Sequence, residues 1–273
     1  MSLVSTKWLI ENIDKVKVFD SSWHLPDDKR NNYQEYITEH IPNSIFFDID
    51  KNSDHCSNLP HMIPSKKNWE KIMSSFGILN DDKIIIYDNS NLISSCRLWF
   101  TFLYFGHNKE LVHVLNGGLN KWKKESLPLT NKINNLTKSS YRAVENKKMV
   151  KNILDIKTNI QDKVFKLIDG RSRERFEGKI PEPREGVRSG SIKDSFCLPF
   201  QNVINDDKTF KNKVELKNIF DQIIYLEDKN NVVFSCGSGI TSCVLALAYS
   251  LINNNYTPTI YDGSWAEYGK III

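Results

Sequence analysis

Cys236 stands where the chain changes from a strand pattern to a helix pattern, a position that suits a reactive thiol. Residues 232–234, Val-Val-Phe, are typical of a buried strand. After the cysteine, the glycine-bearing run 237–241 leads into an apolar stretch of helix length that begins at Ser242. Such a loop turns backbone N–H groups toward one point, and the helix N-terminus adds partial positive charge. Both effects favour a thiolate, so Cys236 is the candidate nucleophile, whereas Cys243 lies within the apolar helix pattern and is expected to pack.

Three chemistries use a thiolate on a strand–loop–helix segment: phosphate ester hydrolysis, hydrolysis by a Cys–His pair, and sulfur transfer. A cysteine phosphatase needs an arginine six residues after the cysteine, and that position is Ser242. A Cys–His hydrolase needs an imidazole nearby, but all six histidines lie at or before His113, so one would have to come from another domain. The small loop suits a spherical sulfur better than a tetrahedral phosphate, which favours a persulfide intermediate.

Composition limits the other function classes. The chain has 273 residues, 40% of them hydrophobic and 26% charged, with a net charge of +4. This mild, scattered charge does not predict a nucleic-acid partner. The five cysteines form no CxxC pair and no Cys/His spacing typical of zinc, so neither a disulfide framework nor a metal site is expected. The first residues do not resemble a signal peptide, and the longest apolar run, Val244–Ile252, is too short to span a membrane. We expect a cytoplasmic protein.

The second half of the sequence repeats the pattern of the first. A strand pattern ends at Asp20 and again at Asp169, and a strand–loop–helix pattern follows at Asp88 and at Cys236. The separations are 88 − 20 = 68 and 236 − 169 = 67 residues. The runs LNGGLNKW and YDGSWAEY come next at similar spacing. This register predicts two tandem α/β domains, each with a mostly parallel sheet and helices on both faces, over residues 1–128 and 141–273, joined by a polar linker at 129–140.

Several motifs resemble one known family. They are CGSGITSC, YDGSWAEYG and DGRSRERFEGKIPEPREGVRSGSI in the second half, and HIPNSIFFDID, SDHCSNLPHMIPS and FGHNKELVHVLNGGLNKW in the first. Together they resemble the two-domain sulfurtransferases of the rhodanese superfamily, and most of all the 3-mercaptopyruvate sulfurtransferases. The similarity covers essentially the whole chain. It implies two rhodanese-like domains, of which only the second keeps the loop cysteine.

The resemblance also implies roles for individual residues. It makes Cys236 the persulfide carrier and Arg175 and Arg184 the groups that bind the substrate. It places Asp50, His61 and Ser238 near the cysteine, where they would assist proton movement. The persulfide would lie in the loop formed by Gly237, Ser238, Gly239, Ile240 and Thr241. No metal or organic cofactor is implied.

The expected reaction moves sulfur from 3-mercaptopyruvate through a Cys236 persulfide to an acceptor, with release of pyruvate. The acceptor would be a thiol, such as thioredoxin or a small thiol, or cyanide. Gly237 and Ser238 are neutral where thiosulfate-specific relatives carry basic residues, so mercaptopyruvate is favoured over thiosulfate. Two alternatives remain at this point: a thiosulfate:cyanide sulfurtransferase, and a non-catalytic sulfur-carrier scaffold.

Overall fold

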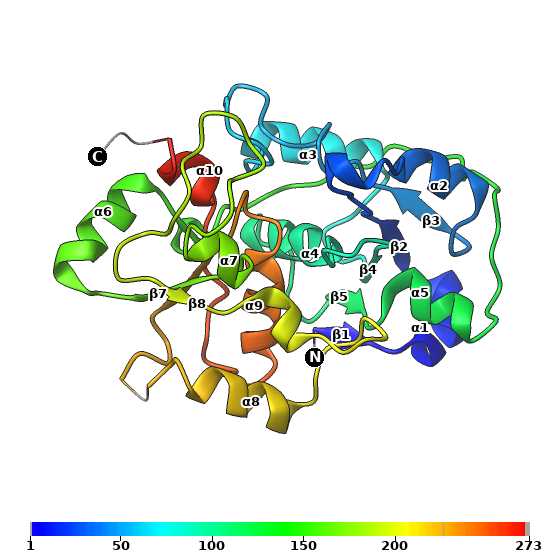
Figure 1. Cartoon of the computed structure of the whole chain (residues 1–273). Coiled ribbons are helices and arrows are strands. Elements are labelled where there is room, and N and C mark those ends of the chain that lie inside the picture. The colour runs from blue at the N-terminus through cyan, green and yellow to red at the C-terminus, as the bar shows by residue number, and fades with distance from the viewer. Residues whose placement is uncertain (1, 226, 271–273) are drawn as a thin grey trace. The chain divides into compact units, whose positions relative to one another are not determined.

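The computed structural model describes residues 2–225 and 227–270, which form two compact units (Figure 1). The first unit contains the residues up to Asp54, then Pro64–Asn146 and Asp206–Thr209. The second contains His55–Ile63, Lys147–Asn205 and the chain from Phe210 onward. No helix in the described part of the chain is long and apolar enough to cross a membrane.

The first unit is built on a parallel sheet of five strands in the order β1-β5-β4-β2-β3. The strands are β1 (Leu3–Val4), β2 (Lys17–Asp20), β3 (Ser44–Phe46), β4 (Ile84–Tyr87) and β5 (Val112–Leu115). The central strands β2 and β4 are buried almost throughout, as both faces of a parallel sheet must be covered.

Helices cover both faces of the first sheet (Figure 1). Because alternate strand residues point to opposite faces, Val18 and Phe19 belong to different halves of the core. Val18 packs in one cluster with Leu9, Leu119 and Trp122, whereas Phe19 packs against Phe102. The helices of this unit are α1 (Thr6–Asn12), α2 (Asn32–Thr38), α3 (Lys66–Ser75), α4 (Ser95–Tyr104) and α5 (Gly118–Lys124), with short 3-10 turns η1 (Ile13–Lys15) and η2 (Pro26–Asp28).

The second unit repeats this plan. Its parallel sheet has the order β6-β10-β9-β7-β8, formed by β6 (Val150–Lys151), β7 (Lys166–Asp169), β8 (Phe196–Cys197), β9 (Val232–Ser235) and β10 (Ile260–Tyr261). Its helices are α6 (Ile153–Asp162), α7 (Arg173–Phe176), α8 (Lys213–Asp221), α9 (Ser242–Ser250) and α10 (Ser264–Tyr268), with 3-10 turns η3 (Lys147–Met149) and η4 (Phe200–Val203). α6 and α10 pack on one face of the sheet, and α8 and α9 on the other.

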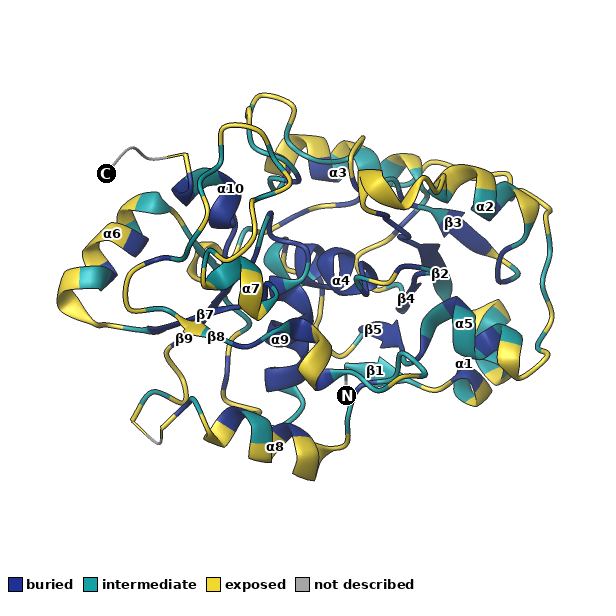
Figure 2. Cartoon of the chain, in the orientation of Figure 1, coloured by how far each residue is buried: buried dark blue, intermediate teal, exposed yellow. Residues whose placement is uncertain are grey.

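Matching positions in the two sheets make β4 equivalent to β9, and α4 equivalent to α9. Both helices are buried over most of their length (Figure 2). The predicted fold, two tandem α/β domains with parallel sheets and helices on both faces, is confirmed.

The two units do not follow the predicted boundaries along the chain. The predicted linker 129–140 belongs to the first unit, where the Ser139 N–H donates to the Ser74 carbonyl at 2.9 Å. In contrast, the segment His55–Ile63 belongs to the second unit, where the Ile63 N–H donates to the Asp262 carboxylate at 2.9 Å. The position of these segments in the sequence does not show which unit they belong to, because each is held by contacts with residues far away in the sequence.

Candidate active site

The loop after β9 carries Cys236 at the carboxyl end of the second sheet, and α10 holds it there. The Cys236 N–H donates to the Ser264 hydroxyl at 3.2 Å. The first N–H groups of α10 are otherwise unused by the helix, and they donate to the loop: Trp265 to the Cys236 carbonyl and Ala266 to the Gly237 carbonyl, each at 2.9 Å. The motif DGSW therefore fixes the backbone on which the thiol stands.

Several hydrogen-bond donors lie close to the sulfur of Cys236. The residue is only 2% exposed, and the Gly239 N–H donates to its Sγ at 3.2 Å. Gly239 has a φ of +81°, a left-handed conformation that suits glycine. Burial raises the pKa of the Cys236 thiol, but hydrogen bonds from the Thr241 hydroxyl and from the N–H groups of Ser238 and Ser242 outweigh it, so the pKa is lowered. The thiolate is therefore favoured without a charged partner in direct contact.

Cys243 fixes the glycine whose N–H contacts the Cys236 sulfur. Its S–H donates to the Gly239 carbonyl at 3.2 Å, while the N–H of the same glycine donates to Cys236 Sγ. Cys243 is fully buried in the first turn of α9, so it packs as predicted, and it also anchors the residue that contacts the nucleophile.

Ser238 links an arginine to a histidine beside the thiol. Its Oγ lies 3.2 Å from Arg184 Nη2 and 2.9 Å from His61 Nδ1. Arginine can only donate, so Oγ accepts from Arg184 and is free to donate its proton to Nδ1. That arrangement places the proton of a neutral His61 on Nε2. His61 is 7% exposed and belongs to the segment 55–63 that folds into the second unit.

Arg175 and Arg184 both lie over Gly237. A Cβ at this glycine would lie 3.2 Å from Arg175 Nη2 and 3.6 Å from Arg184 Nη1. Two guanidinium groups are thus brought to the residue that follows the nucleophile, where together they can hold a carboxylate and a neighbouring carbonyl. Burial lowers the pKa of Arg184, an effect that the nearby Cys236 thiolate opposes.

A buried ion-pair network supports Arg175. Glu182 accepts from Arg175 Nε at 3.1 Å and from Nη2 at 2.6 Å, and it also accepts from Arg171 Nη1 at 2.8 Å. Arg171 in turn pairs with Asp169 at 2.7 Å and lies over the ring of Trp265, 4.5 Å from its centre. Arg171 is therefore part of the framework and does not contact the loop directly.

Asp50 belongs to the first unit. Its carboxylate accepts from the Trp23 indole N–H at 2.9 Å. The remaining predicted site residues, which are Cys236, the loop 237–241, Arg175, Arg184 and His61, all lie in the second unit.

The equivalent loop of the first unit holds a carboxyl group, that of Asp88, whose pKa is raised by burial. After β4 the carboxylate of Asp88 accepts from the N–H groups of Ser90 and Ser95, at 2.8 Å and 3.0 Å. Ser95 starts α4 as Ser242 starts α9. The carboxyl group of Asp88 thus takes the position that the thiol takes in the second unit, and the run 88–94 contains no cysteine.

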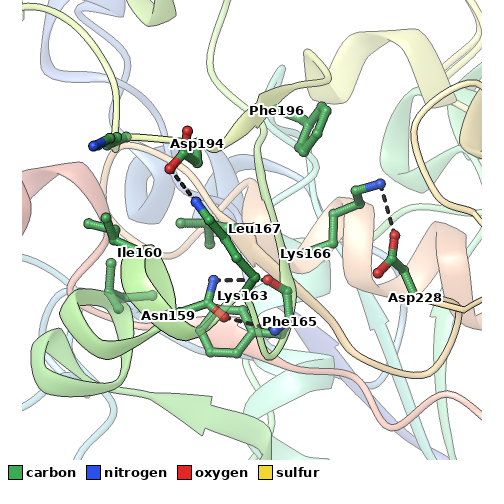
Figure 3. Close-up of a pocket in the computed structure, with 11 residues that line it drawn as sticks. Asn159, Ile160, Lys163, Phe165, Lys166, Leu167, Asp194, Phe196 and Asp228 are labelled. Atoms are coloured by element: carbon green, nitrogen blue, oxygen red, sulfur yellow. Dashed lines mark hydrogen bonds and ion pairs between the residues drawn. The ribbon is translucent and has the colours of Figure 1, made fainter.

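A separate cavity of about 130 Å³ opens near the start of β7 (Figure 3). Lys166 lies at this cavity and pairs with Asp228 at 2.9 Å, and Lys163 pairs with Asp194. No cysteine, histidine or serine lines it. The cavity lies near the amino end of β7, whereas Cys236 follows the carboxyl end of β9. Among the described residues, no group of three or more His, Cys, Asp or Glu side chains is arranged to hold a metal ion.

Three residues of the site were not predicted from the sequence: Glu182, Ser264 and Asp169. Glu182 had a usable signal, because an acidic residue between Pro181 and Pro183, in a segment rich in arginine, is expected to pair with one of them. Ser264 lies in the DGSW motif, but its contact with the Cys236 N–H depends on how β9 and β10 lie side by side.

Comparison with known proteins agrees with this architecture. The family model of the rhodanese-like domain matches residues 5–125 and 152–270. The chain is 36% identical to thiosulfate/3-mercaptopyruvate sulfurtransferase 1, mitochondrial, from Arabidopsis thaliana, over 97% of this chain and 75% of that protein. It is 34% identical to human 3-mercaptopyruvate sulfurtransferase, over 98% and 91% of the two chains.

A solved structure shows the same fold. SseA from Escherichia coli, described among the 3-mercaptopyruvate sulfotransferases, superposes with a TM-score of 0.85 at 32% identity and covers 98% of this chain and 100% of its own. The two repeated sheets, the matches to both halves and the full-length similarity lead to one conclusion: the chain belongs to the rhodanese family and is a sulfurtransferase.

Proposed function

We propose that this protein transfers sulfur from 3-mercaptopyruvate through a persulfide on Cys236. The observation that carries the proposal is the placement of Arg175 and Arg184 over Gly237, next to a buried cysteine whose pKa is lowered. A 2-keto acid offers a carboxylate and a carbonyl side by side, and two guanidinium groups match both.

The first half-reaction is a displacement at sulfur. The Cys236 thiolate attacks the donor sulfur, a new S–S bond forms, and the C–S bond of mercaptopyruvate breaks. The electron pair of that bond leaves on the enolate of pyruvate, which takes up a proton to give pyruvate. The Ser238 hydroxyl, which contacts both Arg184 and His61, can pass its proton to the enolate as it takes one from water, so it is placed to assist this step. Asp50 remains a predicted contributor to the same proton movement.

The second half-reaction returns the enzyme to its thiolate form. The persulfide is stabilised by the donors that lower the pKa of Cys236, above all the Thr241 hydroxyl and the N–H groups of Ser238 and Ser242. An acceptor thiolate attacks the outer sulfur and carries it away. A small thiol, thioredoxin or cyanide fits this chemistry. No metal or organic cofactor takes part in these steps. The cytoplasmic location expected from the sequence stays a prediction.

Thiosulfate is the second candidate donor. The Arabidopsis relative is named for both donors, which supports testing the two side by side. The loop residues Gly237 and Ser238 add no positive charge to the site, and this favours the singly charged mercaptopyruvate.

The decisive experiment maps the sulfur. The protein is incubated with 3-mercaptopyruvate, pyruvate release is measured, and the added sulfur is located by mass spectrometry of peptides. We expect one sulfur on Cys236 and neither pyruvate nor sulfur uptake in Cys236→Ser. Cys197→Ser is the matched control, because Cys197 is partly exposed and burial raises its pKa. A persulfide on another cysteine, or pyruvate release by Cys236→Ser, would refute the proposal.

A further inference from the structure

We infer that Glu182 is a specificity-determining residue: its charge limits the positive charge presented to the sulfur donor and thereby favours singly charged over doubly charged donors. The inference rests on the proposed function, since it concerns the donor that reaches Cys236. Glu182 touches neither the cysteine nor the loop in the structure, and acts through Arg175.

Glu182 is fixed more firmly than a surface carboxylate. Its side chain is 2% exposed, and Pro181 and Pro183 restrict the backbone on either side. One carboxylate oxygen accepts from both Arg171 and Arg175, and the other accepts from Arg175 alone. Three arginine N–H donors thus pair with this buried carboxylate, as a buried charge requires.

This contact decides which edge of Arg175 remains for substrate. Glu182 occupies Nε and Nη2 in a bidentate pair, so the N–H groups of Nη1 and the second N–H of Nη2 are left. Those two nitrogens are the ones nearest Gly237, at 3.8 Å and 3.2 Å from the position of a Cβ. Glu182 therefore both orients Arg175 and offsets its charge.

Apart from the attacking Cys236 thiolate, which opposes the effect of burial on the pKa of Arg184, the connected groups leave one positive charge over. Arg171, Arg175 and Arg184 contribute three positive charges, and Asp169 and Glu182 remove two. Among the described residues Arg184 has no carboxylate within ion-pair distance, and its guanidinium instead donates to Ser238. Arg188 is not hydrogen-bonded to these groups and is left out of this count; its guanidinium lies over the rings of Tyr268 and of Trp265, the indole that Arg171 also contacts.

A site with one uncompensated guanidinium matches a donor with one negative charge. Mercaptopyruvate carries a single carboxylate, whereas thiosulfate carries two negative charges. Removing the charge of Glu182 adds one positive charge to the site, and a dianion gains about twice as much from it as a monoanion does. The substitution Glu182→Gln keeps the size of the side chain while changing this balance.

The test measures kcat/KM for thiosulfate and for mercaptopyruvate in wild type, Glu182→Gln and Glu177→Gln. We expect the ratio of thiosulfate to mercaptopyruvate to rise about tenfold in Glu182→Gln, mainly through KM. The rise should shrink as salt is added, because added ions screen charge. Glu177→Gln is the matched control: it removes the same charge from a carboxylate paired with Arg173 and Lys179, and its ratio should stay at the wild-type value.

A second variant keeps the inference testable if Glu182→Gln does not fold. Glu182→Asp keeps the negative charge beside Arg171 and Arg175 while shortening the side chain, and we expect its ratio to stay at the wild-type value. An unchanged ratio in a folded Glu182→Gln protein, or a shift independent of salt, overturns the inference. If Glu182→Gln does not fold, a ratio in Glu182→Asp that rises above the wild-type value overturns it. Failure of the proposed function is separately visible, since wild type would then form no persulfide on Cys236 with mercaptopyruvate.

Discussion

Cys236 is acidic because hydrogen bonds compensate for its burial. A thiol that is 2% exposed would ordinarily stay protonated, yet donors converge on Sγ from Gly239 and from the start of α9. The Ser242 hydroxyl is buried next to them and has no other hydrogen-bond partner among the described residues. This cysteine is therefore activated mainly by the polypeptide backbone and by hydroxyl groups.

Cys243 offers a way to test that explanation. Replacing it with alanine removes the S–H bond to the Gly239 carbonyl, loosens the peptide whose N–H meets Cys236, and should raise the pKa of Cys236 by less than about one unit. The measurement is the pH dependence of alkylation of Cys236. Cys243→Ser retains a donor and should restore part of the effect. Equal midpoints in wild type and Cys243→Ala would contradict the explanation.

For single residues, the sequence shows which side chains are candidates for the site but not which of them contact one another. Cys236 could be identified because a strand, a glycine loop and a helix are all visible in neighbouring residues. Glu182 and Ser264 could not be assigned, since their roles depend on which loops lie together at the end of the sheet. His61 lies 177 positions before Ser238, and only the folded chain brings the two within 2.9 Å.

At the scale of elements, β2 and β7 end in the same residue with different surroundings. Asp169 at the end of β7 pairs with Arg171, whereas the position equivalent to Arg171 after β2 is Ser22. Ser22 donates to Asp20 through its N–H at 2.9 Å and its hydroxyl at 2.5 Å, but it brings no charge. Burial consequently raises the pKa of Asp20 to about 6.

This difference predicts how stability depends on pH. An acid whose pKa is raised by folding stabilises the protein fully below its ordinary pKa of 3.8, and that contribution is lost as pH rises through about 6. We expect Asp20→Asn to increase the free energy of unfolding at pH 7.5 by up to about 3 kcal/mol, and to have little effect near pH 4. Denaturant titrations at both pH values provide the measurement. Asp169→Asn, which leaves Arg171 short of a partner, should destabilise at pH 7.5; stabilisation by both variants would contradict this account.

Helices and strands with a clear pattern of apolar residues were predicted closely, whereas strands of two residues were not predicted. The predicted strand at residues 232–234 lies in β9, and the predicted helix start at Ser242 is the start of α9. β6 and β10 contain two residues each, too few to show alternation, and exist because a parallel neighbour pairs with them. The helices α6 and α8 begin with an asparagine and an acidic residue that form a capping box, a signal that the sequence did contain.

For the whole molecule, the duplication predicts the number of sulfur atoms carried. The loop after β4 is filled by the carboxylate of Asp88, whereas the loop after β9 holds a thiol. We expect each chain to take up one cyanide-labile sulfur, measured as thiocyanate released after loading and desalting. Cys96, the counterpart of Cys243 in α4, is buried and should stay unmodified. Two labile sulfurs per chain would show that the first unit also carries sulfur.

Two short segments fold with the other unit, and this limits where the chain can be cut into fragments that keep a complete site. His55–Ile63 leaves the first half of the chain to fold with the second unit, and Asp206–Thr209 does the reverse. A gene cut at residues 129–140 would thus produce a C-terminal fragment with Cys236 and both arginines but without His61. The two repeats share one pattern, yet they are not interchangeable modules: recombination at the apparent midpoint would separate the histidine from its serine.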